Sequence, residues 1–231
     1  MTMKKLLQVS AVLLAAVLMF AGCKNNADEG GDDLPGTWVS SLEYYDALQS
    51  NNWTRTANKV QYNCSDISAL GLDEGYSTTY AVGLAEEPQL YGVRVKIKQN
   101  TFTEATPGIV LFRTTSGNGW DSYYQLTFWD GSYILYEKLS GKDRTCLSTR
   151  TDGSKTVCNT YHDAIKAEGN TNEVLFYTDG DKLVLKINGS TIKTIDKKLD
   201  TGDMGACIEI PSYATAPINS SWEFLEFQTA K

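Results

Sequence analysis

The chain has 231 residues, of which 42% are hydrophobic, 11% aromatic and 21% charged, and this composition is typical of a folded domain rather than a disordered segment or a coiled coil. Its formal net charge is −7 and its lysines and arginines are scattered, which argues against nucleic acid as a partner and against a basic membrane-binding face. Tyr, Thr, Ser and Gly are abundant relative to Ala and Leu, which favours strands, and the length fits a single domain.

The first 22 residues have the pattern of an export signal. Lys4 and Lys5 form a basic start, and residues 11–20 form an apolar segment that is too short to span a membrane with flanks of its own. Residues 20–23, Phe-Ala-Gly-Cys, resemble the lipobox of bacterial lipoproteins, although Phe20 stands where Leu is usual. The resemblance implies that Cys23 is lipidated and that the exported protein is anchored to a bacterial membrane, at the outer membrane, the surface or the periplasmic side. The alternative is an ordinary secretory signal followed by a chance cysteine.

Residues 23–35 are expected to form a flexible tether, because they are polar, acidic and glycine-containing and lack apolar periodicity. A segment of this kind spans roughly 20 Å on average, which would keep the domain close to its membrane. Cleavage after residue 22 removes Lys4 and Lys5 and changes the formal net charge from −7 to −9. Residues 36–231 are then predicted to form a single β domain.

Short strands separated by turn residues are predicted for nearly all of this domain. The clearest is 91–98, where Val93, Val95 and Ile97 alternate with basic residues, as a strand with one buried and one solvated face requires. The predicted strands are residues 36–41, 58–63, 77–81, 91–98, 109–114, 120–129, 132–139, 145–149, 155–160, 173–179, 182–187, 190–196, 206–210 and 221–228. The one predicted helical turn is 161–169.

Residues 108–141 carry the densest aromatic content and predict three consecutive antiparallel strands. Tight hairpins are predicted at Asp130-Gly131, Asp152-Gly153 and Asn188-Gly189, because these dipeptides adopt the positive φ angles that two-residue hairpin turns need. Many short strands with almost no helix and no internal repeat indicate a two-sheet antiparallel sandwich.

Several motifs carry a family resemblance. They are Phe112-Arg113 at a strand end, Tyr123-Tyr124, residues 130–133, Asn172, Ile187-Asn188-Gly189 and residues 202–205. With the surrounding segments 109–141, 162–196 and 199–210, they resemble the concanavalin-like, or laminin G-like, jelly-roll families, and most closely the domain of bacterial surface proteins that is named after 3-keto-disaccharide hydrolases. Because the shared elements are mostly turns and core strands, the resemblance implies an all-β jelly-roll sandwich more strongly than any activity.

Four cysteines remain besides Cys23, and an even number in an exported protein favours disulfides. Three pairings are possible. Cys146 with Cys158 is favoured because the two are predicted to lie on the two arms of the Asp152-Gly153 hairpin, close to opposite each other. This leaves Cys64 with Cys207 on an early and a late strand. In the chain-entropy model the short loop contributes about 3 kcal/mol and the long one about 4–5 kcal/mol.

No catalytic motif is recognised. Jelly-roll glycosidases of the laminarinase type carry Glu-x-Asp-x-x-Glu on one strand, and this motif is absent. Glu223 and Glu226 are three residues apart, so on a regular strand they point to opposite faces. His162, the only histidine, has no Gly-x-Ser-x-Gly partner for nucleophilic catalysis and no Cys-x-x-Cys pair for zinc, and it is expected to be exposed or to cap a turn. An enzyme is therefore not favoured.

The predicted ligand site is one face of strand 120–129 with the loops near it. Sugars stack on Trp and Tyr while polar side chains bind their hydroxyls, and alternation places aromatic and polar residues on one face of this strand, opposite Tyr124, Leu126 and Phe128. The candidate ligand-binding residues are Arg113, Trp120, Tyr123, Gln125, Trp129 and Trp53, of which Trp53 and Trp120 are expected in loops. The alternative is that these aromatic residues belong to the core.

No cofactor is predicted. Calcium is common in laminin G-like domains, and its candidate ligands here are Asp179, Asp181, Asp200 and Asp203. Each pair flanks a turn, however, and turn chemistry alone explains it.

Together these observations predict a membrane-anchored, non-catalytic binding lipoprotein that recognises a glycan or another surface ligand. One alternative is a protein-binding accessory subunit or adhesin, for example a partner of a secreted protease complex. A second alternative is a glycoside hydrolase of the keto-disaccharide type.

Overall fold

The computed structural model describes residues 34–40, 52–56, 58–75, 77–85, 90–117 and 119–229. The predicted signal segment, Cys23 and nearly all of the predicted tether lie outside the described residues, so these expectations remain predictions. Within the described ranges, no helix is long and apolar enough to cross a membrane.

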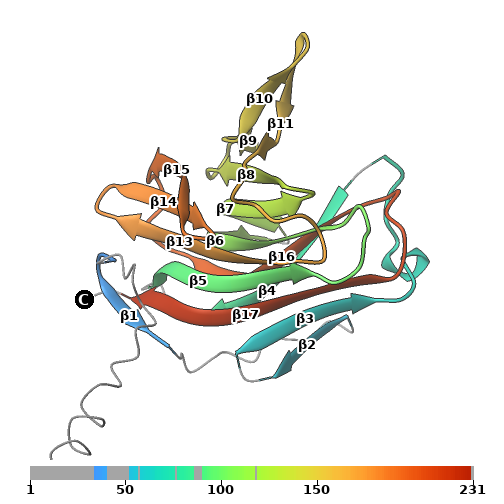
Figure 1. Cartoon of the computed structure of the whole chain (residues 1–231), viewed down its shortest axis with the longest axis horizontal. Coiled ribbons are helices and arrows are strands. Elements are labelled where there is room, and N and C mark those ends of the chain that lie inside the picture. Colours follow the sequence, from blue (N-terminus) through green and yellow to red (C-terminus); the bar gives the residue numbers. More distant parts are fainter. Residues whose placement is uncertain are drawn as a thin grey trace, which may run out of the picture. The chain divides into compact units, whose positions relative to one another are not determined.

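Two antiparallel sheets form the body of the domain, here called the A sheet and the B sheet (Figure 1). The A sheet contains, in spatial order, β15 (Ser190–Asp196), β14 (Lys182–Ile187), β13 (Thr171–Asp179), β5 (Leu90–Gln99), β17 (Ile218–Thr229), β3 (Lys59–Cys64) and β2 (Trp53–Thr56), with β1 (Thr37–Val39) paired to β17. The B sheet contains β12 (Thr160–Tyr161), β8 (Ser132–Lys138), β7 (Gly119–Trp129), β6 (Thr106–Ser116), β16 (Asp203–Pro211) and β4 (Ser77–Ala85), with β9 (Thr145–Cys146) paired to β8. This architecture confirms the predicted all-β jelly-roll sandwich.

A separate two-stranded hairpin, β10 (Thr149–Asp152) with β11 (Lys155–Cys158), projects from the sandwich (Figure 1). Its two strands pair only with each other, and most of their residues are exposed. An isolated hairpin of this size is marginally stable, so its attachment to the B sheet decides how well it is ordered.

The inner faces of the two sheets form the core. In β5, Val93, Val95 and Ile97 are almost completely buried while the alternate basic residues are half-buried, as the alternation predicted. Trp222 of β17 is fully buried, and its indole N–H donates to the carbonyl of Gly108 in β6 at 2.7 Å. The indole therefore packs in the core with its one polar group satisfied by the opposite sheet.

The turn chemistry agrees with the sequence at two of the three predicted dipeptides. At the third hairpin only Gly153 has a positive φ angle, of 60°, because Asp152 still pairs with Lys155 and the turn residues are Gly153 and Ser154. Asp130 and Gly131 have φ angles of 38° and 72°, and Asn188 and Gly189 have 49° and 84°. Two consecutive positive φ angles are what a type I′ hairpin requires, so these dipeptides join β7 to β8 and β14 to β15 without strain.

The predicted helical turn at 161–169 is wrong. Tyr161 belongs to β12, and the segment after it forms turns; the one helical element in the described residues is a short 3-10 turn, η1 (Ser68–Leu70). Asn172 donates to the Lys166 carbonyl at 3.0 Å and accepts from the Lys166 amide at 2.8 Å, and Asn188 donates to the Ala164 carbonyl at 2.7 Å. These side chains satisfy backbone groups that a helix would otherwise pair, so the segment follows the sheet edge instead.

The disulfide between Cys146 and Cys158 is confirmed, with a Cα–Cα distance of 5.8 Å. Its setting differs from the prediction, because Cys146 does not lie in an arm of the hairpin. Cys146 lies in β9 opposite Tyr136 of β8, whereas Cys158 is the last residue of β11. The bond therefore ties the base of the projecting hairpin to the B sheet.

The predicted pairing of Cys64 with Cys207 is wrong, because both are free and buried. Cys64 lies in β3 and is part of the core, opposite Ile218 of β17 in the A sheet. Cys207 lies in β16 of the B sheet, between Ala206 and Ile208, which face the core, so its own side chain points to the other face. The early strand β3, which carries Cys64, does pair with a late strand. That strand is β17 rather than β16, which carries Cys207.

Candidate functional site

The outer face of the B sheet carries most of the predicted ligand-binding residues. In β7, Tyr124, Leu126 and Phe128 face the core, so Tyr123, Gln125, Thr127 and Trp129 lie on the outer face, as the alternation predicted. Only Trp129 is substantially exposed, at 41%, and Gln125 is fully buried. The outer face is therefore largely covered, and it opens near Trp129.

At one end of this face, Arg113, Trp120 and Tyr123 form a cluster. Arg113 makes a two-pronged ion pair with Asp203, with Nε–Oδ1 at 2.8 Å and Nη2–Oδ2 at 2.6 Å. Its guanidinium also lies 5.2 Å from the centre of the Trp120 ring, which in turn packs edge-on against Tyr123. Trp120 is in β7 rather than in a loop. These side chains satisfy one another, so the cluster stabilises the sheet rather than offering an open ligand site.

A bulge places Arg113 in that cluster. Phe112 has a φ angle of 53°, and the pairing of β6 with both neighbours shifts register beside it. Because of the extra residue, Phe112 remains in the core while Arg113 reaches Asp203 on the outer face. The sequence shows the Phe-Arg dipeptide but not the bulge.

A polar network fills the middle of the face. Gln125 Nε2 donates to Glu209 Oε2 at 3.2 Å, and Arg144 Nη1 lies 3.6 Å from the same oxygen. The Arg144 guanidinium is 3.8 Å from the centre of the Tyr136 ring. Burial raises the pKa of both Tyr123 and Tyr136, which keeps these phenols neutral. The network fixes the carboxylate of Glu209, whose side chain is 15% exposed.

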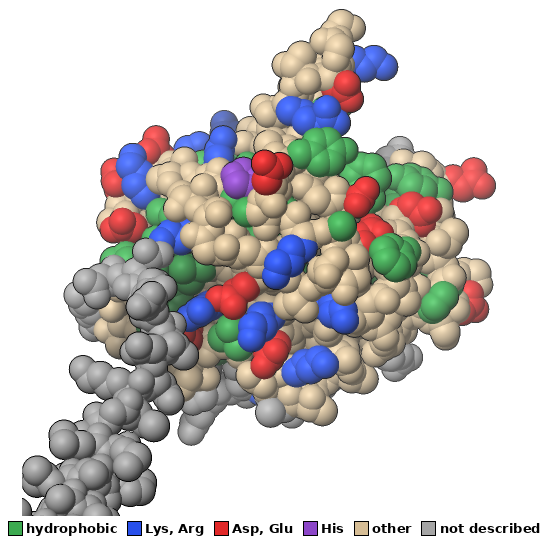
Figure 2. Space-filling model, in the orientation of Figure 1, with side chains coloured by type: hydrophobic (Ala, Val, Ile, Leu, Met, Phe, Trp, Pro, Cys, Tyr) green, Lys and Arg blue, Asp and Glu red, His purple; other side chains and the backbone are tan. Residues whose placement is uncertain are grey.

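A cavity of about 440 Å³ lies at the other end of the same face. Its B-sheet lining includes Trp129, Ile134 and Glu209, and Tyr213, which is 74% exposed, lies at its rim. In Figure 2, hydrophobic side chains gather at the foot of the projecting hairpin. Trp129 and Tyr213 thus offer aromatic surface to a ligand next to the fixed carboxylate of Glu209.

The base of the β10–β11 hairpin forms one wall of this cavity. Arg150, Val157, Cys158 and Asn159 contribute to the lining. Arg150 Nε donates to Asn159 Oδ1 at 2.9 Å, and its guanidinium lies 5.0 Å from the centre of the exposed Tyr161 ring. The wall therefore combines polar and apolar side chains, and its arginine is held in place by neighbours on both sides.

Comparison with known proteins identifies similar folds only. No protein-family model matches the chain, and no curated protein matches it significantly. The carbohydrate-binding module CBM66 from Bacillus subtilis is 7% identical, with 84% of this chain and 92% of that chain covered and a TM-score of 0.43. A prokaryotic β-1,3-1,4-glucanase (lichenase) from a mouse hindgut metagenome is 9% identical (77% and 83% covered, TM-score 0.49), and the κ-carrageenase from Pseudoalteromonas carrageenovora is 10% identical (88% and 99%, TM-score 0.46). Such similarity gives no information about the ligand of this chain.

The structure separates the six candidate residues. Trp129 lines the cavity, and Gln125 lies behind it and holds Glu209. Trp53 is placed wrongly by the sequence: it lies in β2 of the A sheet, is 7% exposed and packs against Tyr62 and Trp222. It belongs to the core, because the pairing of β2 with β3 turns it inward.

Most lining residues escaped prediction, among them Glu209, Arg150, Asn159 and Tyr213. Glu209 lies 84 positions from Gln125 in the sequence and reaches it only because β16 pairs with β6 and β6 with β7. For Arg150 and Asn159, the one available signal was the cysteine pair, because a disulfide at the base of the β10–β11 hairpin places that hairpin beside β8.

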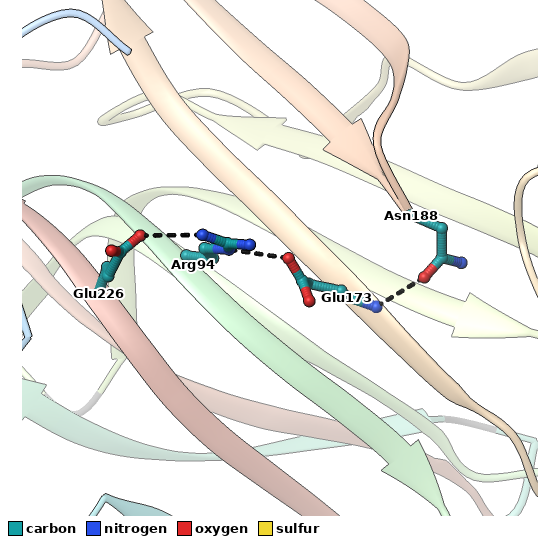
Figure 3. Close-up of polar contacts among 4 residues, drawn as sticks. All are labelled: Arg94, Glu173, Asn188 and Glu226. Carbon is teal, nitrogen blue, oxygen red and sulfur yellow. Dashed lines mark hydrogen bonds and ion pairs between the residues drawn. The ribbon is translucent and has the colours of Figure 1, made fainter. Parts of the chain in front are cut away.

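The outer face of the A sheet carries charged side chains of both signs, and some of these form ion pairs with one another. Arg94 of β5 lies between Glu173 of β13, at 2.8 Å, and Glu226 of β17, at 3.3 Å (Figure 3). Asn188 Oδ1 accepts from the Glu173 amide at 2.9 Å in the same view. The prediction that Glu223 and Glu226 face opposite ways is wrong, because a bulge between Phe224 and Glu226 brings both carboxylates to this face. The ion pairs with Arg94 occupy Glu226.

Three of the four candidate calcium ligands have basic partners, with Asp181 lying 3.9 Å from Lys182. Asp203 binds Arg113, and Asp200 lies 2.6 Å from Lys197. Among the described residues, no group of three or more histidine, cysteine or acidic side chains is placed to hold a metal ion.

Proposed function

We propose that this protein is a non-catalytic module that binds a neutral glycan in the outer-face cavity of the B sheet. The observation that carries the proposal is the exposure of Trp129 (41%) and Tyr213 (74%) beside a cavity whose other lining combines polar and apolar side chains. A sugar ring has an apolar face that stacks on such aromatic rings and hydroxyls that pair with Glu209, Asn159 and Arg150.

The charge of the cavity favours a neutral ligand. Glu104 and Glu209 both line it, and Arg150 is the only basic side chain in the described lining. The whole chain carries a formal net charge of −7 as well. A polyanionic glycan would be repelled both by the carboxylates of the cavity and by the net negative charge of the whole chain.

The same carboxylates argue against hydrolysis. A glycosidase needs one carboxyl group that is protonated and donates its proton, which requires a raised pKa. Hydrogen bonds from its own backbone amide and from that of Thr215 lower the pKa of Glu104. Glu104 is therefore not set up as a proton donor. The carboxylate of Glu209 is engaged by Gln125 and Arg144.

The proposal extends to location: the module is an exported lipoprotein, attached to a bacterial membrane through lipid on Cys23. Lys4, Lys5, the apolar residues 11–20 and the lipobox-like residues 20–23 support this. Labelling with a palmitate analogue tests it, and a Cys23→Ser variant is expected to lose both the label and the membrane fraction. A variant that stays processed and membrane-bound would contradict the lipid anchor.

Glycan binding is tested with a glycan array followed by calorimetry on the strongest ligand. Trp129→Ala is expected to weaken binding at least tenfold, which corresponds to about 1.4 kcal/mol. Phe102→Ala is the matched control, because Phe102 is exposed at 74% but is not among the residues that line the cavity. A stoichiometric protein partner from membrane extract with no sugar signal would favour the adhesin alternative. Sugar hydrolysis abolished by Glu209→Gln would favour the enzyme.

A further inference from the structure

The cavity runs across the strands of the B sheet. Its lining includes residues from five adjacent strands: Ser77 of β4, Glu209 and Pro211 of β16, Thr106 of β6, Trp129 of β7 and Ile134 of β8. At about 4.8 Å per strand, these five strands extend over roughly 19 Å. A glycan bound along this direction would lie perpendicular to the strands.

The two ends of this path differ. At the β8 end, the hairpin closes the path with Arg150, Val157 and Asn159. At the other end, β4 is the outermost strand of the B sheet in the described chain, and Ser77 there is exposed. Within the part of the chain that the structure describes, only the β8 end is therefore blocked by an element that rises from the sheet.

The blocking element is fixed at its base. The disulfide of Cys158 joins it to β9, and the Leu135 amide of β8 donates to Ser148 Oγ at 2.8 Å. Thr160 Oγ1 donates to the Ser148 carbonyl at 2.9 Å, which closes the base from the other side. Three attachments, one of them covalent and two of them through Ser148, hold the wall across the path.

We infer that the cavity binds the end of a glycan chain, with the terminal sugar against the hairpin wall and the rest of the chain leaving over β4. This rests on the proposed glycan binding and adds a specificity to it. A groove that is open at both ends accepts the middle of a polysaccharide, whereas a groove with one closed end accepts only a terminus. The hairpin is then the element that determines specificity.

Counting binding sites per mass of polysaccharide tests the inference. Mixed-linkage β-glucan, galactomannan and arabinan are used intact and after partial acid hydrolysis, and their chain ends are counted chemically. The wild-type protein is expected to show sites per gram that rise in proportion to the number of ends. Sites per gram that do not change on hydrolysis would overturn chain-end binding while leaving glycan binding standing. Binding to none of the three polysaccharides would overturn both.

Two variants identify the wall. In the first, a Gly-Ser-Gly turn replaces residues 149–158 and Cys146 is changed to Ser; in the second, Arg150→Ala and Val157→Ala lower the wall while the hairpin is retained. Both are expected to bind intact polysaccharide with sites per gram that no longer depend on chain ends. Lys155→Ala, at the exposed tip of the same hairpin, is the control and should behave as wild type. Unchanged dependence on chain ends in the second variant would show that the hairpin is not the wall.

Discussion

Removing the Cys146–Cys158 disulfide tests how the projecting hairpin is held. In the Cys146→Ser, Cys158→Ser double variant, the closed loop with a sequence separation of 12 is opened. The chain-entropy relation for a loop of this length gives about 3 kcal/mol of lost stability. The noncovalent contacts of the hairpin are weaker: the Arg150–Asp152 ion pair at 3.3 Å, with Asp152 63% exposed, is worth about 0–1 kcal/mol.

The loss can appear in two ways, and the assay separates them. If the hairpin unfolds together with the sandwich, the urea midpoint falls, and the melting temperature falls by roughly 6–12 °C for a domain of this size. If the hairpin opens by itself, the midpoint changes less, but trypsin cuts after Arg150 and Lys155 under native conditions. Both readouts are measured on the same preparation of the variant.

Conservative changes at neighbouring positions give the control. Thr145→Ser and Thr156→Ser lie on β9 and β11 next to the two cysteines and are exposed. They should leave the midpoint and the trypsin resistance unchanged. If the disulfide-free variant also keeps both, then noncovalent contacts order the hairpin and the disulfide is not what secures the wall of the cavity.

Three further outcomes are expected. Gly202→Ala should destabilise the fold by about 2 kcal/mol or more in urea unfolding. Gly202 has a φ angle of 137°, and an added Cβ would lie 2.3 Å from the carbonyl carbon of Phe112. An unchanged urea midpoint would contradict this close approach. Burial raises the pKa of Tyr124 to about 12 from its ordinary value of 10.0, so the native state holds this proton more tightly than the unfolded state and stability falls as pH rises through this range. Tyr124→Phe should remove up to about 3 kcal/mol of that alkaline loss, and an identical pH dependence would refute the assignment. In the chain from residue 24 onward, Cys64 and Cys207 should react with a thiol reagent only after denaturation, because both are buried; fast reaction in the native state would contradict this.

Much of the fold follows from local chemistry that the sequence displays. Asp130-Gly131 and Asn188-Gly189 form the predicted hairpins because their φ preferences act within two residues. The alternation in β5 and β7 sorts side chains to two faces because a strand has a period of two. The disulfide between Cys146 and Cys158 could also be predicted, because few residues separate the two cysteines.

Several failures occur where one residue changes a register or where distant strands meet. An extra residue between Phe224 and Glu226 reverses the predicted orientation of Glu223 relative to Glu226, and no composition signal marks it. The sequence predicts a loop position for Trp53, but the pairing of β2 with β3 places its side chain in the core. Cys64 and Cys207 fall in different sheets because β17, not β16, pairs with β3.

The sequence alone determined that this chain folds as an antiparallel sandwich with one aromatic and polar face on the strand 120–129, because alternation and turn residues act over short distances. Only the tertiary structure decided where that face is open. Arg113 and Trp120 are occupied by Asp203 and Tyr123, whereas Trp129 remains exposed beside Glu209. Which side chains cover a face depends on strands that pair across the whole chain, and this pairing cannot be inferred from local pattern.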